Sequence, residues 1–132
     1  MVCFLIDDDV DDREIFAITL AEIDTNIKCL TANDGREGIE KLTADESFIP
    51  DYIFLDLNMH RLNGKECLKE IKKIDRLKNT KVIIYSTSSN PQDITETREL
   101  KANGYMVKQA SLSSLRKKLM EVFDTYNYEF II

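Results

Sequence analysis

Five side chains whose types could do chemistry follow short apolar runs along the chain. Asp7 and Asp8 come directly after the first run, and Asp56 comes directly after a later one. Two further runs are followed by Ser86 and Lys108. Carboxylate oxygens in a partly hydrated site suit Mg²⁺, whose natural anionic partner is a phosphoryl group. A hydroxyl and an ammonium group nearby would stabilise the oxygens of that group.

Charge repulsion makes such a group of carboxylates informative. Two carboxylates about 4 Å apart repel by roughly 4 kcal/mol at an effective dielectric constant near 20. A fold would keep three of them together only with a cation between them, or with some of them protonated. We therefore predict a Mg²⁺ site formed by Asp7, Asp8 and Asp56, with Ser86 and Lys108 beside it.

The spacing of apolar residues predicts five strands that alternate with helices. Short apolar runs indicate buried strands, and apolar residues three or four apart indicate one face of a helix. The strands are expected at Val2–Ile6, Ile27–Thr31, Tyr52–Leu55, Val82–Tyr85 and Tyr105–Val107. The helices are expected from Asp11 to Asp24 with Asp11 or Asp12 as cap, after Gly35, from Gly64, from Pro91 to near Asn103–Gly104, and after a cap at Ser111 or Ser113.

Five rounds of strand and helix predict an α/β fold, a doubly wound parallel sheet with helices on both faces. In such a sheet, ligands collect outside the carboxyl ends of the strands, where all five candidate side chains would stand. We assign residues 1–124 to this domain and residues 125–132 to an apolar C-terminal tail.

Composition excludes several other classes of protein. The net charge of −6 argues against a nucleic-acid surface, and no apolar run approaches the roughly 20 residues that cross a membrane. Cys3, Cys29 and Cys67 fit no zinc spacing and are expected to be free thiols in the cytoplasm. His60, the single histidine, is expected on a surface loop.

Four motifs resemble, in order and spacing, the receiver domains of two-component signalling. They are Phe4–Asp9, Ile53–Met59 followed by Gly64, Ile84–Thr87, and Gly104–Lys108. The resemblance covers nearly the whole chain and implies a flavodoxin-like sheet with strand order 2-1-3-4-5. It also implies a receiver of the single-domain type, whose output is binding to another protein or onward transfer of the phosphoryl group.

The resemblance assigns roles to the acidic residues. Asp56 matches the nucleophile that attacks a phosphohistidine and becomes an acyl phosphate. Asp7 and Asp8 match the pair that binds Mg²⁺, with Asp8 as the direct ligand and Asp7 acting through water. The backbone carbonyl of Asn58 matches a further ligand.

The resemblance also assigns a switch. Ser86 matches the hydroxyl that turns inward to hold a phosphoryl oxygen, and Lys108 matches the lysine that pairs with the phosphate. Tyr105 matches the aromatic residue that swings inward after phosphorylation. The implied partners are a histidine kinase or histidine phosphotransfer protein and an unknown downstream protein, with no nucleic acid and no membrane.

One departure from the family pattern concerns Lys108. The family usually has proline after this lysine, with a cis peptide bond before it, whereas this chain has Gln109. A cis bond before a residue other than proline costs about 2.5–4 kcal/mol. Either the site keeps that strain, or the bond is trans and Lys108 is aimed less well.

Two alternative functions stay open. A pseudo-receiver would bind its partner without phosphorylation, which the departure at Gln109 allows. An aspartate-nucleophile phosphohydrolase would carry a second acid two residues after Asp56, where this chain has Asn58. The chain is at most an enzyme that phosphorylates and dephosphorylates itself.

Overall fold

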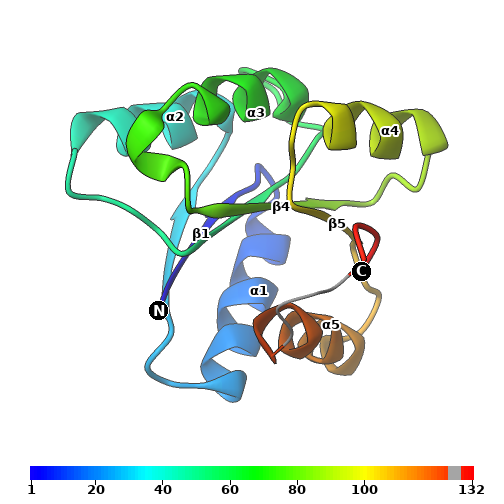
Figure 1. Ribbon diagram of the computed structural model, residues 1–132. Coiled ribbons are helices and arrows are strands. Elements are labelled where there is room, and N and C mark those ends of the chain that lie inside the picture. The colour runs from blue at the N-terminus through cyan, green and yellow to red at the C-terminus, as the bar shows by residue number, and fades with distance from the viewer. Residues whose placement is uncertain (125–128) are drawn as a thin grey trace.

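Five parallel strands form the centre of the computed structural model, which describes residues 1–124 and 129–132 (Figure 1). The strand order is β2-β1-β3-β4-β5, and each neighbouring pair is parallel. The predicted doubly wound sheet and its order are therefore confirmed. The strands are β1 (Val2–Ile6), β2 (Lys28–Ala32), β3 (Tyr52–Leu55), β4 (Lys81–Ser86) and β5 (Gly104–Val107).

Helices cover both faces of this sheet. In Figure 1, α2, α3 and α4 lie on one face, and α1 and α5 lie on the other. Because both faces are covered, the strands are continuous apolar runs rather than alternating ones. The helices are α1 (Val10–Ile23), α2 (Gly35–Ala44), α3 (Gly64–Lys72), the short 3₁₀ helix η1 (Asp75–Leu77), α4 (Pro91–Glu99) and α5 (Leu112–Asp124).

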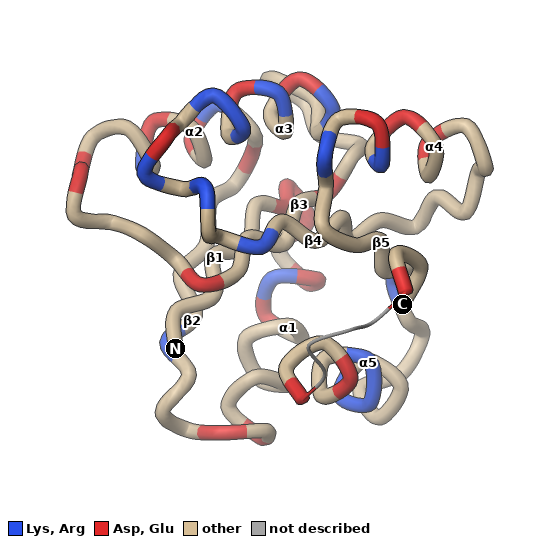
Figure 2. The backbone as a smooth tube through the Cα atoms, viewed as in Figure 1, with Lys and Arg blue, Asp and Glu red and all other residues tan. Residues whose placement is uncertain are grey.

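The core consists of two apolar layers, one on each side of the sheet. Phe4, Ile6 and Leu55 belong to the layer under α2, α3 and α4, and Phe16 and Phe54 belong to the layer under α1 and α5. Figure 2 shows charged residues along the helices and loops and at strand ends, with the middle of the sheet free of them. The charged ends of the strands are therefore where polar chemistry can reach the sheet.

The helix caps follow the sequence in two cases and differ in one. Asn90 caps α4 with Pro91 at its first turn, and the Ser111 hydroxyl accepts the Ser114 N–H at the start of α5. For α1, however, the cap is Asp9, so the expectation of Asp11 or Asp12 was wrong. A cap must have extended backbone and precede the first turn, and the two later residues lie inside that turn.

The predicted end of α4 was also wrong. The helix ends at Glu99, and Lys101 adopts a left-handed backbone with φ of 75°. Asn103 then pairs with the start of β4: its N–H donates to the Val82 carbonyl, and its side-chain oxygen accepts the Val82 N–H, each at 2.8 Å. Because the Asn103 N–H bonds the Val82 carbonyl and not a carbonyl of the preceding turn, Asn103 lies outside the helix.

Some apolar residues of α1 and α5 lie at the surface. Ile15 of α1 is 41% exposed and Leu112 of α5 is 44% exposed. The buried positions of α1 are Phe16, Thr19 and Leu20. Each residue turns a helix by about 100°, so a residue at the margin of an apolar face can leave the core while its neighbours stay in it.

The end of the chain lies against the edge strand β5, where Figure 1 also shows the C-terminus. The Tyr105 N–H donates to the Phe130 carbonyl at 2.7 Å, and the Ile132 N–H donates to the Tyr105 carbonyl at 2.9 Å. Ile131 forms a parallel bridge with Tyr105. Edge strands expose unpaired backbone groups, and this segment covers part of that edge.

Phe130 anchors this segment. Its ring centroid lies 6.5 Å from that of Tyr105, and the Arg98 guanidinium stands 5.2 Å from the Phe130 centroid. Part of the predicted tail, residues 125–128, lies outside the described residues, whereas residues 130–132 pack on the body of the domain. The division of the chain at residue 124 stays a prediction.

No helix among residues 1–124 and 129–132 is long and apolar enough to cross a membrane.

Replacing Phe130 with alanine is expected to loosen the end of the chain. The substitution removes a half-buried ring and its contact with Arg98, so we expect a loss of about 1–3 kcal/mol in the free energy of unfolding. Urea denaturation measures this loss, and amide hydrogen exchange at Tyr105 should become faster. Ile131→Ala is the control, because that side chain is 57% exposed. Unchanged exchange at Tyr105 in the Phe130 variant would contradict the anchoring role.

Candidate functional site

Three carboxylates meet at the carboxyl ends of β1 and β3. Because Ile6 pairs with Leu55 in the parallel ladder, the residues that follow the two strands are neighbours at one edge of the sheet. Asp7, Asp8 and Asp56 each offer a carboxylate oxygen within 4.8 Å of the others. Asp7 is fully buried, Asp56 is 5% exposed, and Asp8 is half-buried. The structure therefore brings together the three acidic residues that the sequence placed in one group.

Lys108 extends from the end of β5 into this group. Its Nζ lies 2.8 Å from Asp7 Oδ2, 2.7 Å from Asp12 Oδ2 and 3.5 Å from Asp56 Oδ2. The bond between Lys108 and Gln109 is trans, as is every other peptide bond among the described residues. The ammonium thus reaches the carboxylates without a cis bond.

Ser86 and Tyr105 both contact Ser88, in the loop after β4. The Ser86 hydroxyl is buried and accepts the Ser88 N–H at 3.2 Å. The Tyr105 hydroxyl donates to the Ser88 carbonyl at 2.7 Å, and the Tyr105 residue is fully buried. The Tyr105 ring therefore lies in the interior, and its hydroxyl is bonded to the loop after β4. The Lys108 N–H donates to the Ser86 carbonyl at 2.8 Å, which ties the ends of β4 and β5 together.

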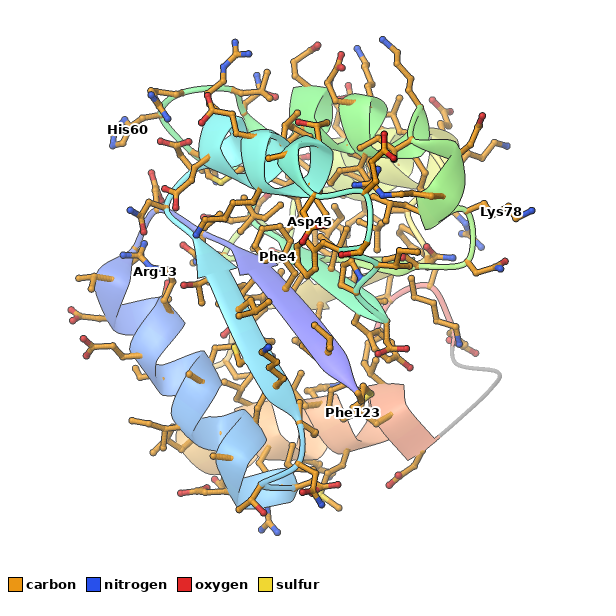
Figure 3. The ribbon with its side chains drawn as sticks, turned by 90° about the vertical axis from the view of Figure 1, so that its left-hand side faces the viewer. Phe4, Arg13, Asp45, His60, Lys78 and Phe123 are labelled. Carbon is orange, nitrogen blue, oxygen red and sulfur yellow. The ribbon has the colours of Figure 1, made fainter. Side chains whose placement is uncertain are left out.

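The loop after β3 lies over the same edge. The Asn58 N–H donates to Asp56 Oδ1 at 3.5 Å. The His60 side chain is 93% exposed, with Nε2 3.6 Å from Asp8 Oδ2, which confirms its expected place on the surface. Figure 3 shows His60 and Arg13 at this end of the molecule, beyond the carboxyl end of β1.

The sequence analysis missed two residues of this site, both in the first turn of α1. Asp12 pairs with Lys108, and Arg13 Nη1 donates to the Asp7 carbonyl at 2.7 Å. Asp12 was considered only as a helix cap. No local pattern could have linked it with Lys108, because 96 positions separate the two residues and the fold alone brings them together.

Burial dominates the electrostatics of the carboxylates. Burial raises the pKa of Asp56 to about 6, the Lys108 ammonium lowers it in part, and the Asp7 carboxylate raises it further. Burial also raises the pKa of Asp7, against the opposing effect of Lys108. For Lys108, burial alone would lower the pKa, but the contacts with Asp12 and Asp7 outweigh it and raise the pKa above its ordinary value. The site therefore carries more negative charge than one ammonium balances.

The residues at this edge fit a divalent cation. Asp7 Oδ2 is buried and accepts no hydrogen bond from the residues that the structure describes, although the Lys108 nitrogen lies 2.8 Å away. A buried oxygen without a hydrogen bond is costly unless a charged group lies beside it. The group supplies oxygen atoms only, which is the donor set of hard divalent cations.

The three cysteines take no part in this site. Cys3, Cys29 and Cys67 are free thiols, as the sequence predicts. Burial raises the pKa of Cys3 and Cys67 to about 12 and that of Cys29 to about 11. Thiols with such pKa values form little thiolate, so they are chemically inert.

Comparison with known protein families shows to which family this domain belongs. Residues 3–120 match the family model described as the response regulator receiver domain. The chain belongs to this family. The receiver is 37% identical over 73 residues to the response regulator Rcp1 of Synechocystis sp., a match that covers 55% of this chain and 50% of Rcp1. This chain thus spans about half the length of that relative.

Solved receiver structures share the fold over nearly the whole chain. The phosphorylated cyanobacterial phytochrome response regulator RcpA superposes with a TM-score of 0.85 at 31% identity, covering 96% of each chain. CheY in the CheX–CheY–BeF₃–Mg²⁺ complex of Borrelia burgdorferi superposes with a TM-score of 0.79 at 26% identity, covering 93% of this receiver and 89% of the other chain. The resemblance inferred from the four sequence motifs is confirmed.

The substitution Gly64→Ala is expected to displace the backbone of Asp56 and Leu57 at the site. A Cβ there would lie 2.2 Å from the Asp56 carbonyl oxygen and 2.5 Å from the Leu57 Cα, so backbone would have to move. We expect a loss of about 1–3 kcal/mol in the free energy of unfolding, measured by urea denaturation. Gly38→Ala is the matched control, because its Cβ would meet the side chain of Ile6 and not backbone, and alanine favours a helix interior. Equal losses in the two variants would contradict this account.

The raised pKa of Asp56 predicts a pH-dependent effect of Asp56→Asn in protein free of metal. The folded state keeps a proton that the unfolded chain releases from about pH 4 upward, so this carboxyl lowers stability as pH rises to about 6. We expect the variant to be about 2–3 kcal/mol more stable than the parent near neutral pH. The difference should shrink as pH falls below 6 and vanish below about 4. Urea denaturation across this range checks it, and a gain that is independent of pH would contradict it.

Proposed function

We propose that this receiver accepts a phosphoryl group on Asp56 and signals through the shape change that follows. The observation that carries the proposal is the meeting of Asp7, Asp8 and Asp56 within 4.8 Å, with the Lys108 ammonium beside Asp7 and Asp56. A carboxylate among other carboxylates is a poor site for a further anion unless cations balance the charge. The ammonium and an oxygen-rich cation site provide that balance.

The proposed reaction moves phosphorus from nitrogen to oxygen. An Asp56 carboxylate oxygen attacks the phosphorus of a phosphohistidine, the N–P bond breaks, and its electron pair returns to the imidazole of the donor. The product is an acyl phosphate on Asp56. Lys108 lies 3.5 Å from Asp56 Oδ2, from where its ammonium can pair with a phosphoryl oxygen. The proposed donor is a histidine kinase or histidine phosphotransfer protein in the cytoplasm.

We propose Mg²⁺ as the cation, held by Asp8 directly, by Asp7 through water, and by Asp56 and the backbone carbonyl of Asn58. When bound, this ion neutralises charge on the phosphoryl oxygens. The Borrelia burgdorferi complex supports the proposal, since its CheY was crystallised with BeF₃ and Mg²⁺. The oxygen-only donor set of the acidic group supports it as well.

The switch in this proposal consists of Ser86 and Tyr105, which both contact Ser88. A phosphoryl oxygen on Asp56 would accept a hydrogen bond from the Ser86 hydroxyl, and movement of Ser86 toward it would alter the hydrogen bond that this hydroxyl accepts from the Ser88 N–H. Because the Tyr105 hydroxyl donates to the Ser88 carbonyl, the same movement would change the hydrogen bond that holds the Tyr105 side chain. A downstream protein that prefers one arrangement would shift the population toward it.

Labelling with acetyl phosphate tests the proposal. The protein incubated with acetyl phosphate and Mg²⁺ should gain the mass of one phosphoryl group, and Asp56→Asn should gain none. Removal of Mg²⁺ with a chelator should also prevent labelling. Asp75→Asn, an exposed substitution in η1, should label like the parent. A parent protein that never labels would support the pseudo-receiver alternative, and labelling that persists in Asp56→Asn would place the acceptor elsewhere.

A further inference from the structure

We propose that Asp12 is a positioning residue that holds the Lys108 ammonium beside the phosphoryl site. This inference rests on the proposed function, because Lys108 acts there on the phosphoryl group. Among the three carboxylates within 3.5 Å of Lys108 Nζ, that of Asp12 lies nearest, with Oδ2 at 2.7 Å in a hydrogen bond. A charge-assisted hydrogen bond of this kind is about twice as strong as a neutral one.

Asp12 differs from the other two partners because it stands outside the cation site. Asp7 and Asp56 belong to the group of three carboxylates that can hold a metal ion, and Asp12 does not. A divalent cation at that group would share the charge of Asp7 and Asp56 and repel the ammonium. Asp12 would then be the carboxylate that still attracts Lys108. The ammonium and the cation can therefore occupy the site together.

The turn that carries Asp12 is held in place. The Asp9 side chain caps α1 and accepts hydrogen bonds from the N–H groups of Asp11 and Asp12. Next along the chain, Arg13 Nη1 donates to the Asp7 carbonyl at 2.7 Å and ties the same turn to the end of β1. A fixed turn gives the Asp12 carboxylate a defined place relative to the acidic group.

The backbone of Lys108 is held by the Ser86 carbonyl, which accepts its N–H at 2.8 Å, but the four flexible carbons of the side chain do not by themselves fix the ammonium. The buried Tyr85 ring lies below the ammonium, with 5.4 Å from Nζ to the ring centroid. Contact with an aromatic face limits the ammonium on one side, and Asp12 limits it on another.

Kinetics of labelling by acetyl phosphate at saturating Mg²⁺ test the proposal. Asp12→Asn should lower the maximal rate roughly five- to tenfold, the effect expected for one charge-assisted hydrogen bond. Asp12→Glu, which keeps the carboxylate, should recover much of the rate. Asp11→Asn is the matched control, since it removes the same charge from the same turn at an exposed position and should label like the parent.

A double-mutant cycle separates positioning from a general effect of charge or stability. If Asp12 acts through Lys108, Asp12→Asn should cause no further loss of rate in a Lys108→Met background. Losses that multiply in the double variant, or equal losses in Asp12→Asn and Asp11→Asn, would overturn the proposal.

A measurement without phosphorylation distinguishes this inference from the proposed function. In the unphosphorylated protein, the NMR signal of the Lys108 side-chain nitrogen should shift in Asp12→Asn and stay in place in Asp11→Asn. An unchanged signal in Asp12→Asn would overturn the positioning role, even if the parent is labelled on Asp56. Conversely, a parent that never labels but shows the shift would reject the proposed function and leave the role of Asp12 intact.

Discussion

Repulsion between buried carboxylates, offset only in part by one buried ammonium, is the interaction on which the rest of this structure depends. Asp7 and Asp56 follow adjacent parallel strands, so the sheet itself forces their charges together. Burial then raises the pKa of both carboxyl groups, because water no longer solvates their charged forms. Lys108 offsets part of this cost and is itself kept charged by its carboxylate neighbours. A site in this balance responds strongly to any added charge, whether a cation or a phosphoryl group.

Hydrogen bonds and an ion pair connect the loop after β4 to α3, α4 and β5. The Ser88 hydroxyl donates to Asp93 of α4 at 2.6 Å, and Lys65 of α3 lies 2.7 Å from Asp93. Ser88 also receives the Tyr105 hydroxyl from β5, whose backbone pairs with the end of the chain. These contacts form a short route from the loop after β4 to α4, to β5 and, through β5, to the C-terminal residues. This route fits a domain whose output is a change of surface.

Family membership and geometry answer different questions about this protein. The match to the response regulator receiver domain explains the strand order and the position of the acidic group. Geometry explains how the chain manages without proline after Lys108. The bond between Lys108 and Gln109 is trans, which is one of the two alternatives that the sequence left open, and in this arrangement the ammonium contacts Asp7, Asp12 and Asp56.

The sequence by itself determined the fold class and the five strands to within one residue at each end, because buried parallel strands are continuous apolar runs and the carboxyl ends of such strands share one edge. It also predicted that Asp7, Asp8 and Asp56 lie together. Tertiary structure alone decided the Asp12–Lys108 pair and the docking of Phe130 on β5. Local patterns reflect only neighbours along the chain. The Asp12–Lys108 pair joins residues that are 96 positions apart, and nothing in the local pattern selects β5 as the strand on which Phe130 docks. The start of α1 and the end of α4 likewise depend on hydrogen bonds made by Asp9 and Asn103, which the spacing of apolar residues does not predict.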